Sequence, residues 1–193
     1  MVDERVPAHP SNRQGVRAGV ALVGFMGAGK STVGRELAQQ LGWQFLDLDE
    51  LIEEREQRKI DDIFRRDGET GFRRLECAAV RTATQSAASG PVVLALGGGA
   101  FIDPEVRSCL AEAQIPAIFL DAPVAELFRR SEQPGVNRPL RRDEEQFRQL
   151  YERRRPEYLK AAMCVETHGK LIASVAQEII SELNLVPFSG ACD

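Results

Sequence analysis

Long apolar segments are missing from this sequence. It contains no run of 18 or more apolar residues and no apolar core of a signal peptide near its start. These features exclude a chain that is built to cross a membrane as a helix. We therefore expect a soluble protein of the cytoplasm that does not bind a membrane.

An excess of positive charge is missing as well. The chain has 25 lysines and arginines against 29 aspartates and glutamates, which gives a formal net charge of -4. A broad basic surface for nucleic acid is therefore excluded, and a small-molecule partner is favoured.

Cysteine and histidine are scarce, with four and two residues. The cysteines show no C-x-x-C spacing and no histidine close by, so a metal or redox centre has little support. We interpret Cys77, Cys109 and Cys164 as small buried or half-buried residues, and Cys192 as a thiol of the tail.

The composition is that of one globular domain. The 193 residues are 43% hydrophobic and 28% charged, which suffices for a single substantial core. Residues 1–16, with two prolines and little apolar periodicity, are predicted to be a disordered leader. We expect a monomeric domain over residues 17–185 and a frayed tail over 186–193.

The most informative segment is G-F-M-G-A-G-K-S, at residues 24–31, which fits the pattern G-x-x-x-x-G-K-[ST]. It lies between an apolar run at 19–23 and a helix-like stretch at 32–41. Glycines let backbone N–H groups point at phosphate oxygens, Lys30 reaches the β- and γ-phosphates, and Ser31 offers a hydroxyl to Mg²⁺. The sequence therefore predicts a nucleotide-binding loop.

Strand-like apolar runs alternate with helical patterns along the rest of the chain, which predicts a parallel α/β sheet. The candidate strands are residues 20–23, 44–46, 92–96, 117–120 and 163–165. Four-residue spacing predicts helix faces that pack on the sheet, with Val33, Leu37 and Leu41 in one helix and Leu171, Val175, Ile179 and Leu183 in another.

Two segments do not fit a simple alternation of strands and helices. A helical stretch at about 48–88, broken near Lys59 and at Gly68, is too long for a simple crossover and indicates a substrate-binding insertion. It holds an apolar group formed by Ile60, Ile63 and Phe64. Residues 133–143, with two prolines, a glycine and three arginines, are typical of a mobile loop.

Three further groups carry candidate chemistry. Asp47 and Asp49 end a predicted strand, where residues two apart share a face; either they organise Mg²⁺ and a hydroxyl, or Asp49 only caps a helix from about Glu50. Arg73 and Glu76 have helix-pair spacing, which suits a carboxylate ligand or a solvated face. Three glycines at 97–99 follow a strand and allow close approach of a ligand, or form a simple turn.

Taken in order, the motifs G-F-M-G-A-G-K-S-T, D-L-D, F-R-R-L-E, L-G-G-G, N-R-P-L and R-R-R-P-E-Y resemble those of shikimate kinases. The resemblance covers about residues 19–183. It implies a three-layer α/β P-loop kinase fold with a five-stranded parallel sheet, a helical substrate-binding insertion and a lid. It also implies transfer of the γ-phosphoryl group of ATP, with Mg²⁺, to the 3-hydroxyl of shikimate, a step of aromatic amino-acid biosynthesis.

The resemblance also implies residue roles. Catalysis would rest on Lys30, Asp49 and Arg138, and the metal on Ser31 and Asp47. ATP would be bound by Gly27, Ala28, Gly29, Lys30, Ser31, Thr32, Arg130 and Arg138, with Arg130 on the adenine. Shikimate would be bound by Asp49, Phe64, Phe72, Arg73, Glu76, Gly97, Gly98, Gly99 and Arg154.

The chain departs from that family in places. Arg141 and Arg142 follow N-R-P-L where an apolar residue is usual, Glu157 stands at another usually apolar position, and the spacing from Arg130 to Arg138 differs by about one residue. Two alternatives stay open, namely a related small-molecule kinase such as one for gluconate, and a regulatory nucleotide-binding module without turnover.

Overall fold

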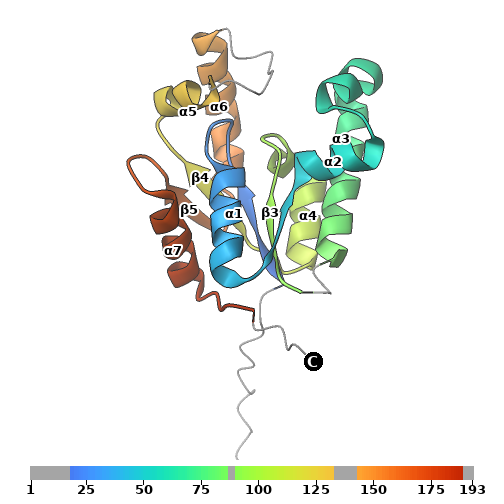
Figure 1. The fold of residues 1–193 in the computed structure, drawn as a ribbon. Coiled ribbons are helices and arrows are strands. Elements are labelled where there is room, and N and C mark those ends of the chain that lie inside the picture. Colours follow the sequence, from blue (N-terminus) through green and yellow to red (C-terminus); the bar gives the residue numbers. More distant parts are fainter. Residues whose placement is uncertain (1–17, 87–89, 133–142, 189–193) are drawn as a thin grey trace, which may run out of the picture.

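The computed structural model describes residues 18–86, 90–132 and 143–188. A five-stranded parallel sheet with strand order β2-β3-β1-β4-β5 forms its centre (Figure 1). The strands are β1 (Gly19–Val23), β2 (Gln44–Asp47), β3 (Val92–Ala95), β4 (Ala117–Asp121) and β5 (Met163–Glu166). Each lies where the sequence predicts a strand, so the predicted α/β fold class is confirmed.

The inner strands are apolar on both faces because helices cover the sheet from both sides. Every residue of β1, β3 and β4 is buried. The described helices are α1 (Lys30–Leu41), α2 (Leu48–Glu56), α3 (Ile60–Ser86), α4 (Pro104–Glu112), α5 (Val124–Ser131), α6 (Glu144–Tyr158) and α7 (Ile172–Leu183), with a short 3-10 helix, η2 (Ala100–Ile102).

Helices α1 and α7 lie side by side on one face of the sheet, and α3, α4 and α6 lie on the other (Figure 1). The spacing prediction is confirmed for α1, whose Val33, Leu37 and Leu41 are buried. It is wrong for Leu171, which is 77% exposed because it precedes the first turn of α7 and does not share that helix's buried face.

The long segment after β2 forms α2 and α3, with the breaks at the predicted places. Helix α2 ends at Glu56 and α3 begins at Ile60. Within α3, Gly68 has φ 69° and ψ -177°, a conformation that glycine adopts easily and that kinks the helix. Helix α2 and the first part of α3 lie beyond the carboxyl end of β2, and the rest of α3 runs back along the sheet beside α4 (Figure 1).

The chain segment after α7 packs against the turn between α1 and β2. The Trp43 indole N–H donates to the Val186 carbonyl at 3.2 Å, and the Phe188 N–H donates to the Leu41 carbonyl at 2.8 Å. The first residues of the predicted tail are therefore attached to the turn between α1 and β2.

The cysteine prediction is right for two residues and wrong for one. Cys77 is buried and Cys109 half-buried, whereas Cys164 is exposed because it lies on the outer face of the edge strand β5. Within the described ranges, none of the helices is both long and apolar enough to span a lipid bilayer.

Candidate active site

The phosphate-binding loop follows β1 and ends at the first residue of α1. Gly27 and Gly29 have φ of 79° and 87°, and a Cβ on Gly27 would collide with the backbone of Leu127. Glycine is required there by both the backbone angle and the space. Gly29 is the N-cap of α1, so the free N–H groups and positive end of the helix face the loop.

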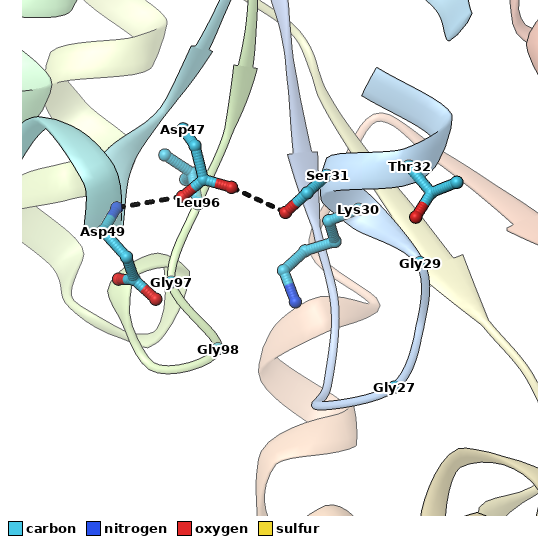
Figure 2. A pocket seen from close by; sticks show the side chains of 10 residues that line it. All are labelled: Gly27, Gly29, Lys30, Ser31, Thr32, Asp47, Asp49, Leu96, Gly97 and Gly98. Atoms are coloured by element: carbon cyan, nitrogen blue, oxygen red, sulfur yellow. Dashed lines mark hydrogen bonds between the residues drawn. The ribbon is translucent and has the colours of Figure 1, made fainter. Parts of the chain in front are cut away.

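Lys30 crosses this loop from the first turn of α1. Its Nζ donates to the carbonyls of Gly24 at 3.0 Å and Phe25 at 3.1 Å. These bonds hold the ammonium group over the loop, where it points into a pocket (Figure 2). A cation held there is suited to binding the outer phosphates of a nucleotide.

Asp47 connects the loop to the next strand and helix. Its Oδ2 accepts a 2.6 Å hydrogen bond from the Ser31 hydroxyl, and its Oδ1 accepts the Asp49 N–H at 3.1 Å (Figure 2). Asp47 is thus the N-cap of α2, and Asp49 belongs to the helix. The alternative in which Asp49 caps the helix is therefore wrong. The expectation that the two acids share one face of a strand is also wrong, because α2 follows β2 without a loop.

Both acids nevertheless reach the same pocket. Its lining combines the phosphate loop with the ends of β2 and β3: Gly27, Gly29, Lys30, Ser31, Thr32, Asp47, Asp49, Leu96, Gly97 and Gly98. Asp49 lies across this pocket from Lys30 (Figure 2). Open α/β sheets bind ligands at this carboxyl edge, where strand order places β3 and β4 on either side of β1.

The Ser31 hydroxyl and the Asp47 carboxylate are hard oxygen donors of the kind that Mg²⁺ prefers. Among the described residues, no group of three or more His, Cys, Asp or Glu side chains is arranged to hold a metal ion. A Mg²⁺ ion here would therefore take most of its ligands from phosphate and water, as is usual for this cation in phosphoryl-transfer sites.

The three glycines at residues 97–99 form a turn after β3, called the glycine turn below. Arg73 and Glu76 pair on α3, next to this turn. Arg73 Nη1 lies 2.5 Å from Glu76 Oε2, and Glu69 contacts the same guanidinium at 3.3 Å. Glu76 is 1% exposed, and its Oε1 has no hydrogen-bond partner within the described part of the chain. Burial raises the pKa of the Glu76 carboxyl, and Arg73 offsets part of that rise.

Gly97 and Gly99 lie directly against this pair. A Cβ on Gly97 would lie 2.9 Å from Glu76 Oε1 and 3.0 Å from Asp49 Oδ1. A Cβ on Gly99 would lie 2.7 Å from Arg73 Nη1. At Gly97 and Gly99 a side chain would therefore displace a charged group, whereas a Cβ on Gly98 would make only ordinary contacts.

Arg154 approaches the same turn from α6. Its Nη1 donates to the Gly98 carbonyl at 3.2 Å, and its guanidinium lies 5.9 Å from the centre of the Phe25 ring. The predicted residues Phe64 and Phe72 contact each other with ring centres 4.4 Å apart, and Phe64 is 38% exposed. Two arginines thus lie at the glycine turn, and the aromatic pair adjoins one of them, since the Arg73 guanidinium lies 5.5 Å from the centre of the Phe72 ring.

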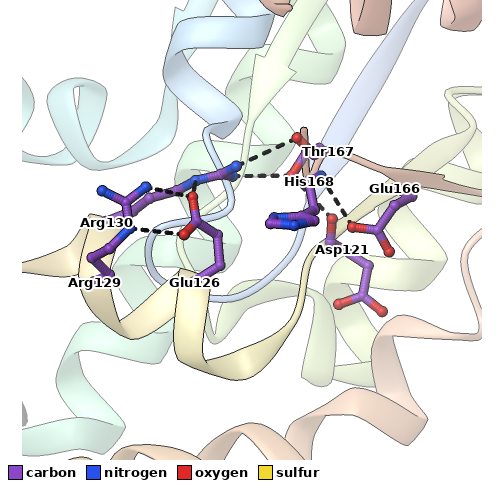
Figure 3. Close-up of polar contacts among 7 residues, drawn as sticks. All are labelled: Asp121, Glu126, Arg129, Arg130, Glu166, Thr167 and His168. Atoms are coloured by element: carbon purple, nitrogen blue, oxygen red, sulfur yellow. Dashed lines mark hydrogen bonds and ion pairs between the residues drawn. The ribbon is translucent and has the colours of Figure 1, made fainter. Parts of the chain in front are cut away.

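Arg130 lies on α5, close to the loop that follows β5. Its Nε donates to Glu126 Oε1 at 2.8 Å and its Nη1 to Thr167 Oγ1 at 3.1 Å. Arg129 also binds Glu126, so one carboxylate holds two guanidinium groups (Figure 3). Arg130 is half-buried in this cluster and does not line the pocket around Lys30. Arg138 and the rest of the predicted lid up to residue 142 lie outside the described residues.

Sequence reasoning missed two residues near the site. The buried Tyr158 hydroxyl donates to the Gly98 carbonyl, beside Arg154, and burial raises the pKa of Tyr158 to about 12. The signal was its four-residue spacing from Arg154 on one helix face. Asp121, at the end of β4, accepts hydrogen bonds from Tyr151 at 2.8 Å and Arg155 at 3.1 Å and so fixes α6 to the sheet.

The parallel sheet, the phosphate loop with its lysine and serine, and the facing carboxylate define a P-loop kinase. A family model, described as shikimate kinase, matches residues 26–184. This chain belongs to the shikimate kinase family.

Individual relatives agree with that assignment. A curated shikimate kinase of Thermus thermophilus is 43% identical over 167 residues, covering 85% of this chain and 89% of the relative. One of Geobacter metallireducens is 41% identical over 167 residues, covering 85% and 90%. A solved shikimate kinase from Acinetobacter baumannii in complex with shikimate is 36% identical, with a TM-score of 0.78, and covers 86% of this chain and 92% of that one.

Proposed function

We propose that the protein transfers the γ-phosphoryl group of ATP to the 3-hydroxyl of shikimate, giving ADP and shikimate 3-phosphate. One observation carries the proposal. Lys30 and Ser31 of the phosphate loop share a pocket with Asp49 and the glycine turn, so a nucleotide and an acceptor can meet there. The chain's membership of the shikimate kinase family supports the choice of acceptor.

On the nucleotide side, Lys30 and the loop N–H groups bind the phosphates. Ser31 would hold Mg²⁺, and Asp47, which accepts a hydrogen bond from the Ser31 hydroxyl, would support it. When bound, the cation neutralises charge on the phosphate oxygens. Arg130 stacks on the adenine, with Glu126 and Thr167 holding its guanidinium in place.

On the acceptor side, Arg73 and Arg154 bind the shikimate carboxylate, which suits two guanidinium groups at one turn. Glu76 orients Arg73, while Phe64 and Phe72 form an apolar wall. Asp49 accepts a hydrogen bond from the reacting hydroxyl and takes its proton late in the transfer. The backbone of Gly97, Gly98 and Gly99 completes this subsite.

The reaction is an in-line transfer that depends on positioning and charge neutralisation. Arg138 of the lid supplies positive charge to the transferring phosphoryl group. Its loss should lower kcat by roughly 10²- to 10³-fold, the scale for one electrostatic donor, whereas alanine at Arg141 or Arg142 should cost less than about tenfold. Equal losses at Arg138 and Arg141 would assign the charge to a different lid residue.

The two alternative functions have weaker support. A gluconokinase from Sinorhizobium meliloti has a TM-score of 0.55 at 20% identity, which is a likeness of fold alone. A module without turnover would have lost Lys30, Asp49 or Arg138, and the chain keeps all three.

The deciding experiment measures ADP release with ATP, Mg²⁺ and separate acceptors: shikimate, gluconate and a nucleoside monophosphate. We expect turnover with shikimate only, and none when Mg²⁺ is chelated. Comparable turnover of another acceptor would overturn the proposal. We also propose that the protein is a cytoplasmic monomer that does not bind nucleic acid. Gel filtration of the purified protein tests the oligomeric state.

A further inference from the structure

Arg107, on α4, joins the far end of the glycine turn to α6. Its Nη1 lies 2.9 Å from the Phe101 carbonyl and 2.8 Å from the Ile102 carbonyl, the last two residues of η2. The same nitrogen lies 3.0 Å from Glu157 Oε2 on α6. One guanidinium group therefore binds a short helix end and a glutamate 50 residues further along the chain.

The chemistry of this contact is specific. The last carbonyls of a helix have no partner within it, and Arg107 supplies donors to two of them. The side chains of Arg107 and Glu157 are 24% and 29% exposed, so water screens their attraction only in part. Lys160, and then Arg107, lower the pKa of the Glu157 carboxyl, which is therefore ionised at neutral pH.

Both ends of this link continue directly into the acceptor subsite. Helix η2 is bonded to the glycine turn, since Ala100 N–H donates to Gly97 O at 3.1 Å and Ile102 N–H to Gly99 O at 3.2 Å. On α6, Glu157 lies three residues after Arg154, whose guanidinium binds the Gly98 carbonyl. The link and the Arg154 contact thus join the same two elements at two places.

We propose that Glu157 and Arg107 are positioning residues for the acceptor, because they fix the separation between the glycine turn and the Arg154 guanidinium. This inference rests on the proposed function, in which Arg154 and the turn bind shikimate together. Neither residue touches the substrate. Their pairing keeps Arg154 in the geometry that a carboxylate needs, so its loss weakens acceptor binding without changing the nucleotide site.

Glu157 is the residue that carries this proposal, since its carboxylate accepts from Arg107 and an apolar side chain at this position could not. Both oxygens of this glutamate are paired: Oε2 binds Arg107 and both oxygens bind Lys160, at 2.7 and 2.8 Å. Lys160 itself contacts Glu157 and not the turn in these bonds, so it offers a matched control.

The test measures KM for shikimate, KM for ATP, kcat and the melting temperature of Glu157→Leu, Glu157→Gln, Arg107→Met and the Glu157→Leu/Arg107→Met double variant. We expect KM for shikimate to rise about two- to fivefold in Glu157→Leu, the scale of a partly exposed ion pair, with KM for ATP unchanged. The increase in KM for shikimate should be smaller in Glu157→Gln, because the amide oxygen of glutamine still accepts from Arg107. In the double variant, KM for shikimate should increase by less than the product of the two single increases.

Lys160→Met should leave KM for shikimate within error of the wild type. The inference is overturned if Glu157→Leu leaves KM for shikimate unchanged, if Lys160→Met raises it equally, or if KM for ATP rises in parallel. A purely structural role would lower the melting temperature of Glu157→Leu with KM unchanged, which also overturns it. Wild-type protein that turns over another acceptor in place of shikimate would instead refute the proposed function itself.

Discussion

Asp47 holds Ser31 with one carboxylate oxygen and the start of α2 with the other. The Ser31 hydroxyl donates to Oδ2 at 2.6 Å, and the Asp49 N–H donates to Oδ1 at 3.1 Å. One side chain therefore sets the position of the hydroxyl proposed to bind Mg²⁺ relative to the carboxylate that faces the acceptor. The two acids stand two residues apart and have different tasks.

Asparagine substitutions separate these tasks. Asp47→Asn should raise the Mg²⁺ concentration for half-maximal rate by roughly 10- to 100-fold, the usual cost of losing a residue that supports a metal ligand. Asp49→Asn should lower kcat by roughly 10²- to 10⁴-fold, with ATP affinity nearly intact, because it removes the group that accepts a proton. Rate measurements over a Mg²⁺ titration distinguish the two.

A loss of folding stability should not contribute to the kinetic differences between these two variants. Asparagine is as good an N-cap as aspartate, so Asp47→Asn keeps α2 in place. Melting temperatures of both variants should therefore lie close to that of the wild type. The same kinetic defect in both variants would refute the division of tasks between Asp47 and Asp49.

The sequence predicts the fold well because its signals are local. Five apolar runs, each followed by a helical pattern, are sufficient to predict a parallel sheet, since both faces of such a sheet are buried. The junction of β2 and α2 is less predictable. A strand that passes into a helix without a loop changes the direction of its side chains between Asp47 and Asp49, and the two-residue alternation no longer applies.

The arginines at the glycine turn are expected to set acceptor affinity. Arg73→Ala and Arg154→Ala should each weaken shikimate binding by about 1.5 to 3 kcal/mol, the range for hydrogen bonds to charged groups, and leave ATP binding nearly intact. Arg153→Ala is the matched control, because Arg153 neighbours Arg154 but is exposed on α6. Calorimetric titration of each variant with both ligands provides the measurement; normal shikimate affinity in either Arg73→Ala or Arg154→Ala would remove that arginine from the site.

Glu76 should make the stability of the protein depend on pH. Burial raises its pKa above the ordinary value of 4.5, so the folded protein keeps this proton at pH values where the unfolded chain has lost it. Stability then falls as pH rises. The unfolding free energy of the wild type, relative to Glu76→Gln, should decrease as the pH rises above 4.5 in urea unfolding experiments.

Glu126 provides a control of opposite sign. Arg129, and then Arg130, lower the pKa of Glu126 to about 2 (Figure 3). Its contribution is therefore present above the unfolded value of 4.5 and is lost as pH falls toward the folded value. Relative to Glu126→Gln, the wild type should lose stability on acidification. A common trend for both pairs of proteins would contradict the environments described for these carboxylates.

The site is less predictable than the fold because its contacts join distant parts of the chain. The spacing of Tyr158 places it on the same helix face as Arg154, but only the fold brings its hydroxyl to the Gly98 carbonyl, 60 residues away. The contact of Arg107 with Glu157 spans 50 residues. Such pairs leave no periodic pattern, whereas Arg73 and Glu76 pair within one helix turn and are predictable from their spacing.

Gly99 should control shikimate affinity through Arg73. Its φ of -114° is open to any residue, so the constraint is one of space: a Cβ there would lie 2.7 Å from Arg73 Nη1. In Gly99→Ala the flexible guanidinium must move away and lengthen its bond to Glu76. We expect shikimate affinity to fall about five- to tenfold, or roughly 1 to 1.4 kcal/mol, with little change in melting temperature.

The decisive comparison adds Gly99→Ala to Arg73→Ala. If the glycine acts through Arg73, the added alanine should have almost no further effect in that background, because the side chain that it displaces is gone. A full additional loss would show that the added methyl group disturbs the acceptor subsite independently of Arg73.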